Sequence, residues 1–200
     1  MKHQIDLIDA ETGYEGFFLL KSYRLRHSLY AGGMSRELVR ERVERLRAVA
    51  VLLYDPDLDR VVLIEQFRIG ALEQGAGAWL LEIVGGMWEE EEPPREVARK
   101  EAREEAGCAI LELLPIGDVW VSPGTASERV MLYCGRVDAS GAAGVHGLDH
   151  EGEDIKVVVM AFHQAMEALS RGRISAATAI IALQWLALNR ERVRERWIRG

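Results

Sequence analysis

A segment in the middle of the chain constrains both the local fold and the chemistry. It reads GGMWEEEEPPREVARKEAREEAGC over residues 85–108. Prolines fit the first turn of a helix and a glycine ends one, so we expect a helix over 94–106 that stops at Gly107. The apolar run at 80–84 predicts a strand before it. A strand, a glycine-containing loop and a helix are therefore expected to follow one another.

Three glutamates share one face of this predicted helix. Glu101, Glu104 and Glu105 are spaced i, i+3 and i+4, which places their carboxylates within one turn. Glu101 and Glu105 have no basic residue three or four positions away in the helix, whereas Glu104 has Lys100 four positions before it. The face is either a solvated acidic surface or a site for Mg²⁺ or Mn²⁺, which favour oxygen ligands.

The whole chain limits the classes of protein that remain. Its 200 residues are 48% hydrophobic and 28% charged, which predicts one globular domain or a domain with an appendage. A net charge of −7 argues against nucleic acid or an acidic membrane as a partner. We expect no signal peptide, and the apolar stretch 176–188 is too short to cross a bilayer and predicts a buried helix. Cys108 and Cys134 fit reduced thiols and a cytoplasmic protein.

Apolar periodicity divides the chain into elements. Residues 1–45 are rich in charge, with short alternating runs that predict a small N-terminal β domain, and residues 46–200 form the second domain. The strands are expected at 48–54, 60–67, 78–84, 116–121, 129–137 and 155–162, and the helices at 94–106, 163–171 and 176–196. Mixed strands with helices between them predict an α+β or α/β sandwich.

An acidic loop precedes the last predicted strand. Glu151 and Glu153 lie in the polar stretch 147–154. Alone this is a solvated turn, but beside a metal-binding helix such a loop can supply a metal ligand or a general base. His146 and His150 have a spacing that can bind Zn²⁺ on a helix, but a glycine and an aspartate between them disfavour a helix. Exposed loop histidines are the preferred interpretation.

Other polar segments keep two interpretations each. The turn-rich stretch 122–129 is an ordinary surface loop or a place to hold sugar hydroxyls. The adjacent Phe17 and Phe18 are core residues or an aromatic stacking surface. Three arginines either pair with an acid or clamp a phosphate: Arg40, Arg45 and Arg68.

Segment 85–108 resembles the signature of the Nudix hydrolases, Gly-x5-Glu-x7-Arg-Glu-U-x-Glu-Glu-x-Gly-U, where U is a bulky apolar residue. Gly86 opens the match, Glu92 follows, and the three helix glutamates and Gly107 are in register. Three positions depart from the signature: Lys100 replaces arginine, and the smaller Ala102 and Cys108 replace bulky residues. A match of this length is far more specific than a lone glycine fingerprint.

From Tyr14 to Trp197 the chain resembles one Nudix branch, the bacterial ADP-ribose pyrophosphatases. The stretches that carry the resemblance, besides the Nudix segment, are GFFLLKSYRLRH, VVLIEQFRIG, SPGTASER, GVHGLDHEGEDI and ATAIIALQWL. Pro123 stands sixteen residues after Gly107, a spacing associated with this branch. The resemblance implies the Nudix α/β/α sandwich with a small N-terminal β domain, which is exchanged between the subunits of a homodimer.

The resemblance also implies a role for each candidate residue. The Gly85 carbonyl, Glu101, Glu105 and Glu153 would hold Mg²⁺, for which Mn²⁺ or another divalent cation can substitute. Glu104 joins the metal site in some relatives, but Lys100 could occupy it here. Glu151 would be the general base. The nucleotide sugar would contact Phe17 and Phe18 at the adenine, Arg40, Glu41 and Arg45 from the partner subunit, and Arg68, Met87, Ser122, Gly124 and Glu128 around the diphosphate and terminal ribose.

The implied reaction is hydrolysis of the diphosphate bridge of ADP-ribose to AMP and ribose 5-phosphate. One alternative is a pyrophosphatase for another nucleoside diphosphate sugar, such as GDP-mannose. A second is a non-catalytic Nudix-fold ligand sensor. Sensors of that kind tend to lose glutamates of the signature, and this sequence has all three and shows no helix-turn-helix pattern.

Overall fold

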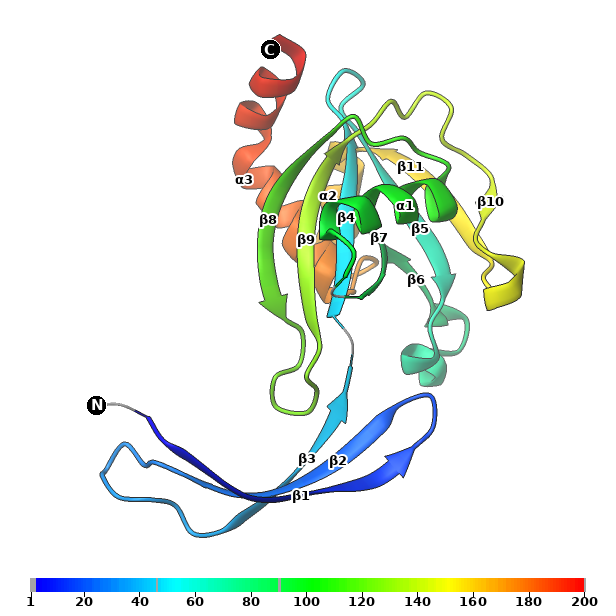
Figure 1. Cartoon of the computed structure of the whole chain (residues 1–200). Helices are drawn as coiled ribbons and strands as arrows, with labels where there is room; N and C mark the ends of the chain where they lie inside the picture. Colours follow the sequence, from blue (N-terminus) through cyan, green and yellow to red (C-terminus); the bar gives the residue numbers. More distant parts are fainter. Residues whose placement is uncertain (1–2, 46, 90, 200) are drawn as a thin grey trace. The chain divides into compact units, whose positions relative to one another are not determined.

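The computed structural model describes residues 3–45, 47–89 and 91–199 (Figure 1). The chain divides into two compact units. The N-terminal unit consists of Met1–Leu46 and Trp120–Arg129, and the main unit consists of Arg47–Val119 and Val130–Gly200.

The N-terminal unit is a three-stranded antiparallel sheet. Its strands β1 (Ile5–Glu15), β2 (Leu19–His27) and β3 (Leu38–Glu44) lie in the order β1-β2-β3, which confirms the predicted small β domain. The segment 120–129 joins this sheet through Val43, which donates to the Thr125 carbonyl over 2.9 Å and accepts from the Ser127 N–H over 3.0 Å. No described residue of this unit is buried, and Ile5 is 75% exposed.

The main unit is built on an eight-stranded sheet. Six strands follow the order β10-β11-β5-β4-β9-β8, while β6 pairs with β5 and β7 pairs with β4. The pairing of β4 with β9 is parallel, and β4 is antiparallel to β5 and to β7. The strands are β4 (Arg47–Asp55), β5 (Arg60–Phe67), β6 (Trp79–Glu82), β7 (Val84–Trp88), β8 (Glu112–Trp120), β9 (Arg129–Arg136), β10 (Val145–His146) and β11 (Ile155–Ala161).

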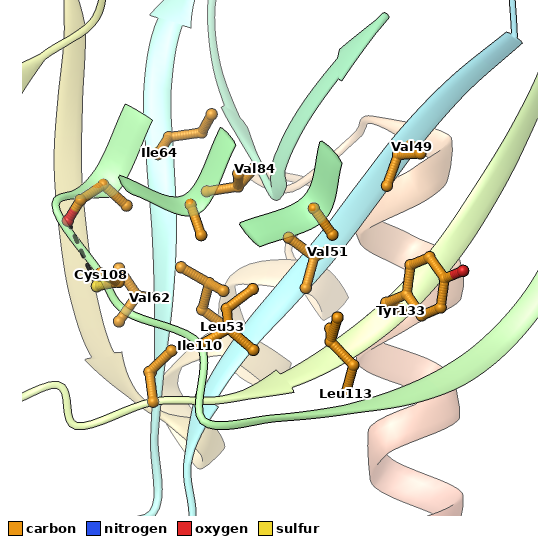
Figure 2. Packing of buried hydrophobic residues seen from close by; sticks show 14 of the residues in the cluster. Val49, Val51, Leu53, Val62, Ile64, Val84, Cys108, Ile110, Leu113 and Tyr133 are labelled. Atoms are coloured by element: carbon orange, nitrogen blue, oxygen red, sulfur yellow. Dashed lines mark hydrogen bonds between the residues drawn. The ribbon is translucent and has the colours of Figure 1, made fainter. Parts of the chain in front are cut away.

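Helices cover the two faces of this sheet. Alternate residues of β4 enter two separate cores: Val49, Val51 and Leu53 pack under α1 (Pro94–Ala106), as Figure 2 shows. The residues between them join a second core with α2 (Phe162–Ser170) and α3 (Ala177–Arg199). A strand buried on both faces needs apolar residues at every position, as the run AVAVLLY supplies. The expected α/β/α sandwich is confirmed.

Most predicted elements are present, but several differ from the prediction. The single strand expected at 78–84 is two strands, β6 and β7, separated at Ile83. The 3₁₀ helix η1 (Ile69–Ala78) was not expected. The interpretation of 176–188 as a buried helix is wrong for one face of α3, because Leu188 is 86% exposed. In the described part of the chain, no helix is long and apolar enough to cross a membrane.

Candidate active site

The helix α1 lies where its sequence predicts. It begins at Pro94, directly after Pro93, and Gly107 follows its last residue with the left-handed φ of 62° that favours glycine. Val97, Ala98 and Ala102 are buried against the sheet. Two of the three are alanines, and such small side chains let the helix lie close to the strands beneath it. The three glutamates lie in the second half of the same helix, and Glu105 is also buried.

Two glycines of β7 receive two of these carboxylates. The Gly85 N–H donates a 2.9 Å hydrogen bond to Oε2 of Glu105, and Glu105 is only 3% exposed. A Cβ atom at Gly86 would overlap the Glu101 carboxylate. The glycine pair therefore gives both carboxylates room against the strand backbone, which a larger residue at position 86 would fill.

The two carboxylates lie in an environment that disfavours their charge. Burial raises the pKa of Glu105 to about 8; the charges of Glu101 and Glu153 add to this, while the Gly85 hydrogen bond and Arg68 oppose it. Burial likewise raises the pKa of Glu101 to about 7. Lys100 opposes that shift, and the carboxylates of Glu104, Glu153 and Glu151 strengthen it. The loop carboxylates therefore act electrostatically on the helix carboxylates.

A divalent cation fits this arrangement. Within residues 3–45, 47–89 and 91–199, no group of three or more His, Cys, Asp or Glu side chains is gathered closely enough to hold a metal ion by itself. Mg²⁺, however, keeps several water ligands and needs only one or two carboxylates together with substrate phosphates. Glu101 and Glu105 supply two carboxylates that lack a compensating ion pair among the described contacts, and a bound cation would favour their charged forms.

Glu104 differs from the other two helix glutamates. Its Oε2 lies 3.8 Å from Nζ of Lys100, and both side chains are partly exposed. Lys100, four residues earlier, can therefore compensate the charge of the Glu104 carboxylate, so this carboxylate is a weaker candidate for a metal ligand.

The loop before β11 holds the other two candidate carboxylates. Glu151 ends the short 3₁₀ helix η2 (Asp149–Glu151) and is exposed, with Oε1 3.7 Å from Nε2 of His150. Glu153 is half-buried and its Oε2 accepts a 3.0 Å hydrogen bond from the Leu148 N–H. The two glutamates therefore lie in different environments although they are two residues apart.

The histidine interpretation is half right. His150 is exposed, as expected. His146 is not an exposed loop residue, because it lies on β10, is half-buried and has Nε2 2.9 Å from the Ala143 carbonyl oxygen. Neither belongs to a zinc-type cluster of His, Cys, Asp or Glu in the described residues.

The main unit also contains Arg68 and Met87. Arg68 follows β5 and donates from Nε to Oε2 of Glu82 over 2.8 Å, so it is paired with an acid in this structure. Sequence reasoning missed Glu82. The signal was a single carboxylate in the apolar run WLLE, and strand pairing places it opposite Ile64. Met87 on β7 is exposed.

The N-terminal unit brings four candidate residues together. Arg45 lies over the ring of Phe18, with its guanidinium carbon 4.9 Å from the ring centroid, and its Nη2 is 3.4 Å from Oε1 of Glu128. Phe17 is 83% exposed and packs edge-on against Phe18, with centroids 4.8 Å apart. In this unit the two phenylalanines are therefore surface aromatic residues rather than core.

The remaining candidates of this unit are not gathered into that group. Ser122 Oγ lies 2.8 Å from Thr125 Oγ1, and the space around Gly124 is open. Arg40 and Glu41 are consecutive on β3, and both are exposed. Because side chains alternate along a strand, these two point to opposite faces of the N-terminal sheet.

Comparison of the chain with known proteins identifies its family. Residues 44–182 match the NUDIX domain family. The chain belongs to the Nudix family. It is 46% identical over 196 residues to a protein of Escherichia coli K12 named ADP-ribose pyrophosphatase, which covers 98% of this chain and 94% of that protein. A protein of the same name from Haemophilus influenzae is 43% identical over 202 residues, covering 100% and 93%.

Two further relatives are more distant. A protein named GDP-mannose pyrophosphatase from Cronobacter sakazakii is 32% identical over 190 residues, which covers 94% of this Nudix chain and 97% of that protein. A solved structure, described as the crystal structure of ADP compounds hydrolase, superposes with a TM-score of 0.73 at 19% identity and covers 96% and 97% of the two chains. At that identity the superposition supports the fold alone.

Proposed function

We propose that this Nudix protein hydrolyses the diphosphate bridge of ADP-ribose to AMP and ribose 5-phosphate in a reaction that depends on Mg²⁺. One structural observation carries the proposal: Glu101 and Glu105 lie on one face of α1 against the glycines of β7 without ion pairs among the described contacts. The substrate follows from the relatives named ADP-ribose pyrophosphatase, which align with nearly the whole chain.

The proposed metal ligands all belong to the main unit. Glu101, Glu105, Glu153 and the Gly85 carbonyl would hold Mg²⁺, whereas Glu104 has Lys100 within 3.8 Å and is the weakest member of the set. A bound Mg²⁺ supplies positive charge to the diphosphate and lowers the pKa of a water molecule. This supply of charge matters for an anionic substrate because the chain itself has a net charge of −7.

Glu151 is the proposed general base. It is exposed, so it can accept a proton from an attacking water, and its charge acts on Glu101. Glu153 is held by the Leu148 N–H and suits a fixed ligand better than a proton acceptor. The different surroundings of the two glutamates support the separate roles that we assign to them.

The proposed substrate contacts draw on both units. In the N-terminal unit, Phe18 and Phe17 offer aromatic surface for the adenine, and Arg45 and Glu128 offer charged groups beside it. The remaining residues that we propose to contact the nucleotide sugar are Arg40, Glu41, Arg68, Met87, Ser122 and Gly124. For Arg68 this requires release of at least part of its ion pair with Glu82.

We also propose a homodimer in which residues 1–45 form a domain that is exchanged between subunits. The physical support is the exposure of the N-terminal unit, since apolar side chains such as Ile5, Leu7 and Tyr14 are left in contact with water in a single chain. A sheet that buries no residue of its own is a poor independent folding unit and gains stability by covering such side chains. Arg40, Glu41 and Arg45 would then serve a ligand held by the partner subunit.

The test is an assay of the purified protein with a panel of nucleoside diphosphate sugars and Mg²⁺, with products identified by chromatography. The expected result is AMP and ribose 5-phosphate from ADP-ribose, with a kcat/KM well above that for GDP-mannose. The relatives named GDP-mannose pyrophosphatase make GDP-mannose the second candidate substrate. Preference for GDP-mannose would replace the proposed substrate, and no hydrolysis of any sugar with Mg²⁺ or Mn²⁺ would refute the enzyme proposal.

A further inference from the structure

The loop with Glu151 and Glu153 is the connection of a short hairpin. Its first strand, β10, has two residues, Val145 and His146, which pair with Lys156 and Ile155 of β11, and the Val157 N–H also donates to the Gly144 carbonyl over 3.0 Å. So short a ladder fixes the position of the loop between β10 and β11 only weakly. The position of the loop carboxylates must therefore depend on contacts outside the ladder.

One such contact joins the loop to the end of α1. The Gly147 N–H donates a 3.1 Å hydrogen bond to the Glu104 carbonyl. In a longer helix this carbonyl would accept from the N–H of Cys108, but that N–H donates to Ala102 instead. The loop therefore supplies the hydrogen-bond donor for the Glu104 carbonyl, which has no donor within α1. Glu104 lies between Glu101 and Glu105 in the sequence and on the same helix face.

A second contact is the ring of His146 over Gly107. A Cβ at Gly107 would come within 2.7 Å of Cε1 of this ring, so the ring occupies the space that the glycine leaves free. Nε2 of His146 is 2.9 Å from the Ala143 carbonyl oxygen, which fixes the ring in that direction. The side chain therefore packs on the left-handed turn that closes α1.

A third contact joins Gly147 and Leu148 to the Glu153 side chain. Gly147 has a φ of 105°, and a Cβ there would lie 2.7 Å from Cβ of Glu153. The next residue, Leu148, donates from its N–H to Oε2 of Glu153 over 3.0 Å. Gly147 and Leu148 therefore contact α1 on one side and the Glu153 side chain on the other.

We propose that His146, Gly147 and Leu148 form a positioning bracket, which holds the carboxylates of Glu153 and Glu151 at a set distance from those of α1. The three residues touch no reacting atom in this scheme and act only through the loop. The proposal rests on the proposed function for the role of these carboxylates as metal ligand and base.

The decisive experiment compares Gly147→Ala with Gly144→Ala. Gly144 has nearly the same backbone strain, with a φ of 99°, but a Cβ there would meet only Nε2 of His146 at 3.7 Å, an ordinary contact. Both variants should lower Tm because of the shared backbone strain, and Gly147→Ala should lower it further because its Cβ would overlap that of Glu153. Only Gly147→Ala should weaken Mg²⁺ binding, by roughly tenfold in titration calorimetry, as expected when the support of a metal ligand is disturbed. Gly144→Ala should stay within about twofold of the wild type.

A second pair of variants tests His146 by amide hydrogen exchange at Gly147, a measurement that needs neither metal nor substrate. His146→Phe keeps a ring over Gly107 and should exchange slowly, whereas His146→Ala should exchange at least roughly tenfold faster. Equal losses of Mg²⁺ affinity in both glycine variants, or no loss in either, would overturn the bracket. If the wild type binds no divalent cation, the proposed function fails, while the exchange data still decide whether the bracket exists.

Discussion

Arg40 and Glu41 are neighbours on β3 and point to opposite faces of the N-terminal sheet. A ligand bound on one face can therefore meet only one of the two through its side chain, and the other proposed contact is then made through the backbone. Because a diphosphate is anionic, we expect Arg40 to be the residue that uses its side chain. Arg40→Ala should raise KM for ADP-ribose by roughly tenfold, a typical loss for one charged contact, while Glu41→Ala should stay within about threefold. Steady-state kinetics at saturating Mg²⁺ measures both.

Equal increases in KM for the two variants would contradict this expectation. They would mean that the ligand reaches around the edge of the sheet and contacts both side chains. Val39→Ala is the matched control, because Val39 is an exposed neighbour on the same strand without a charge.

The variant Glu105→Gln should distinguish the contribution of the Glu105 charge to catalysis from the contribution of its packing to stability. Glu105→Gln keeps the shape of the side chain and the acceptor for the Gly85 N–H, so Tm without metal should not fall. It removes one of the two carboxylates proposed to hold the metal ion, so kcat should fall by roughly 10²-fold or more, as when a main electrostatic element of an active site is lost.

Glu104→Gln is the control for the Glu105 variant. Its carboxylate is compensated by Lys100, so the same change should cost kcat no more than roughly tenfold. Full activity of the wild type in excess chelator would refute the metal dependence on which both expectations rest.

Sequence analysis predicted those features of the site that depend on residues close together in the sequence. Helical spacing placed Glu101, Glu104 and Glu105 on one face, and proline and glycine marked the ends of α1, because both effects act within a few residues. The division of 78–84 into two strands at Ile83 was missed, since an apolar run carries no sign of where a ladder changes partner.

The contacts that were not found join distant parts of the sequence. Arg45 and Glu128 are 83 residues apart, and their pairing depends on segment 120–129 joining β3. Arg68 was left open between an acid and a phosphate, and the choice of Glu82 follows only from the register of β5 with β6. His146 was assigned to an exposed loop because the turn at Gly107 that it covers lies on another element.

The raised pKa values predict how stability changes with pH in metal-free protein. Between the ordinary value of 4.5 and the folded values of about 7 for Glu101 and about 8 for Glu105, the folded state binds more protons than the unfolded state. The free energy of unfolding therefore decreases as pH rises through this window. In chelator, Tm should fall between pH 5 and pH 8, and Mg²⁺ should remove most of that fall by replacing the protons.

The double variant Glu101→Gln/Glu105→Gln is the control for the pH effect. Without the two titrating groups, its Tm in chelator should vary less over the same range than that of the wild type. An equal slope in both proteins, measured by differential scanning calorimetry, would assign the pH dependence to other residues.

Glu151 and Glu153 should give different kinetic signatures. Glu153→Gln should weaken Mg²⁺ affinity, measured by calorimetry, because Glu153 is a proposed ligand held by the Leu148 N–H. Glu151→Gln should lower kcat by roughly 10²-fold or more with Mg²⁺ affinity and KM little changed, as for a group that acts in the transition state. Near-normal turnover of Glu151→Gln at saturating Mg²⁺ would rule out Glu151 as the base.

Two damaged subunits should restore one working site if the proposed dimer shares its sites. One chain carries Glu105→Gln and the other carries Arg40→Ala. If each site takes Arg40 from one chain and Glu105 from the other, a mixed dimer has one site with both lesions and one with neither. Assayed below KM, it should recover up to roughly half of the wild-type activity when the sites are independent. If both residues of a site come from one chain, each site keeps one lesion and no recovery is expected. No recovery after proven subunit exchange, or full activity of a monomer, would therefore count against shared sites.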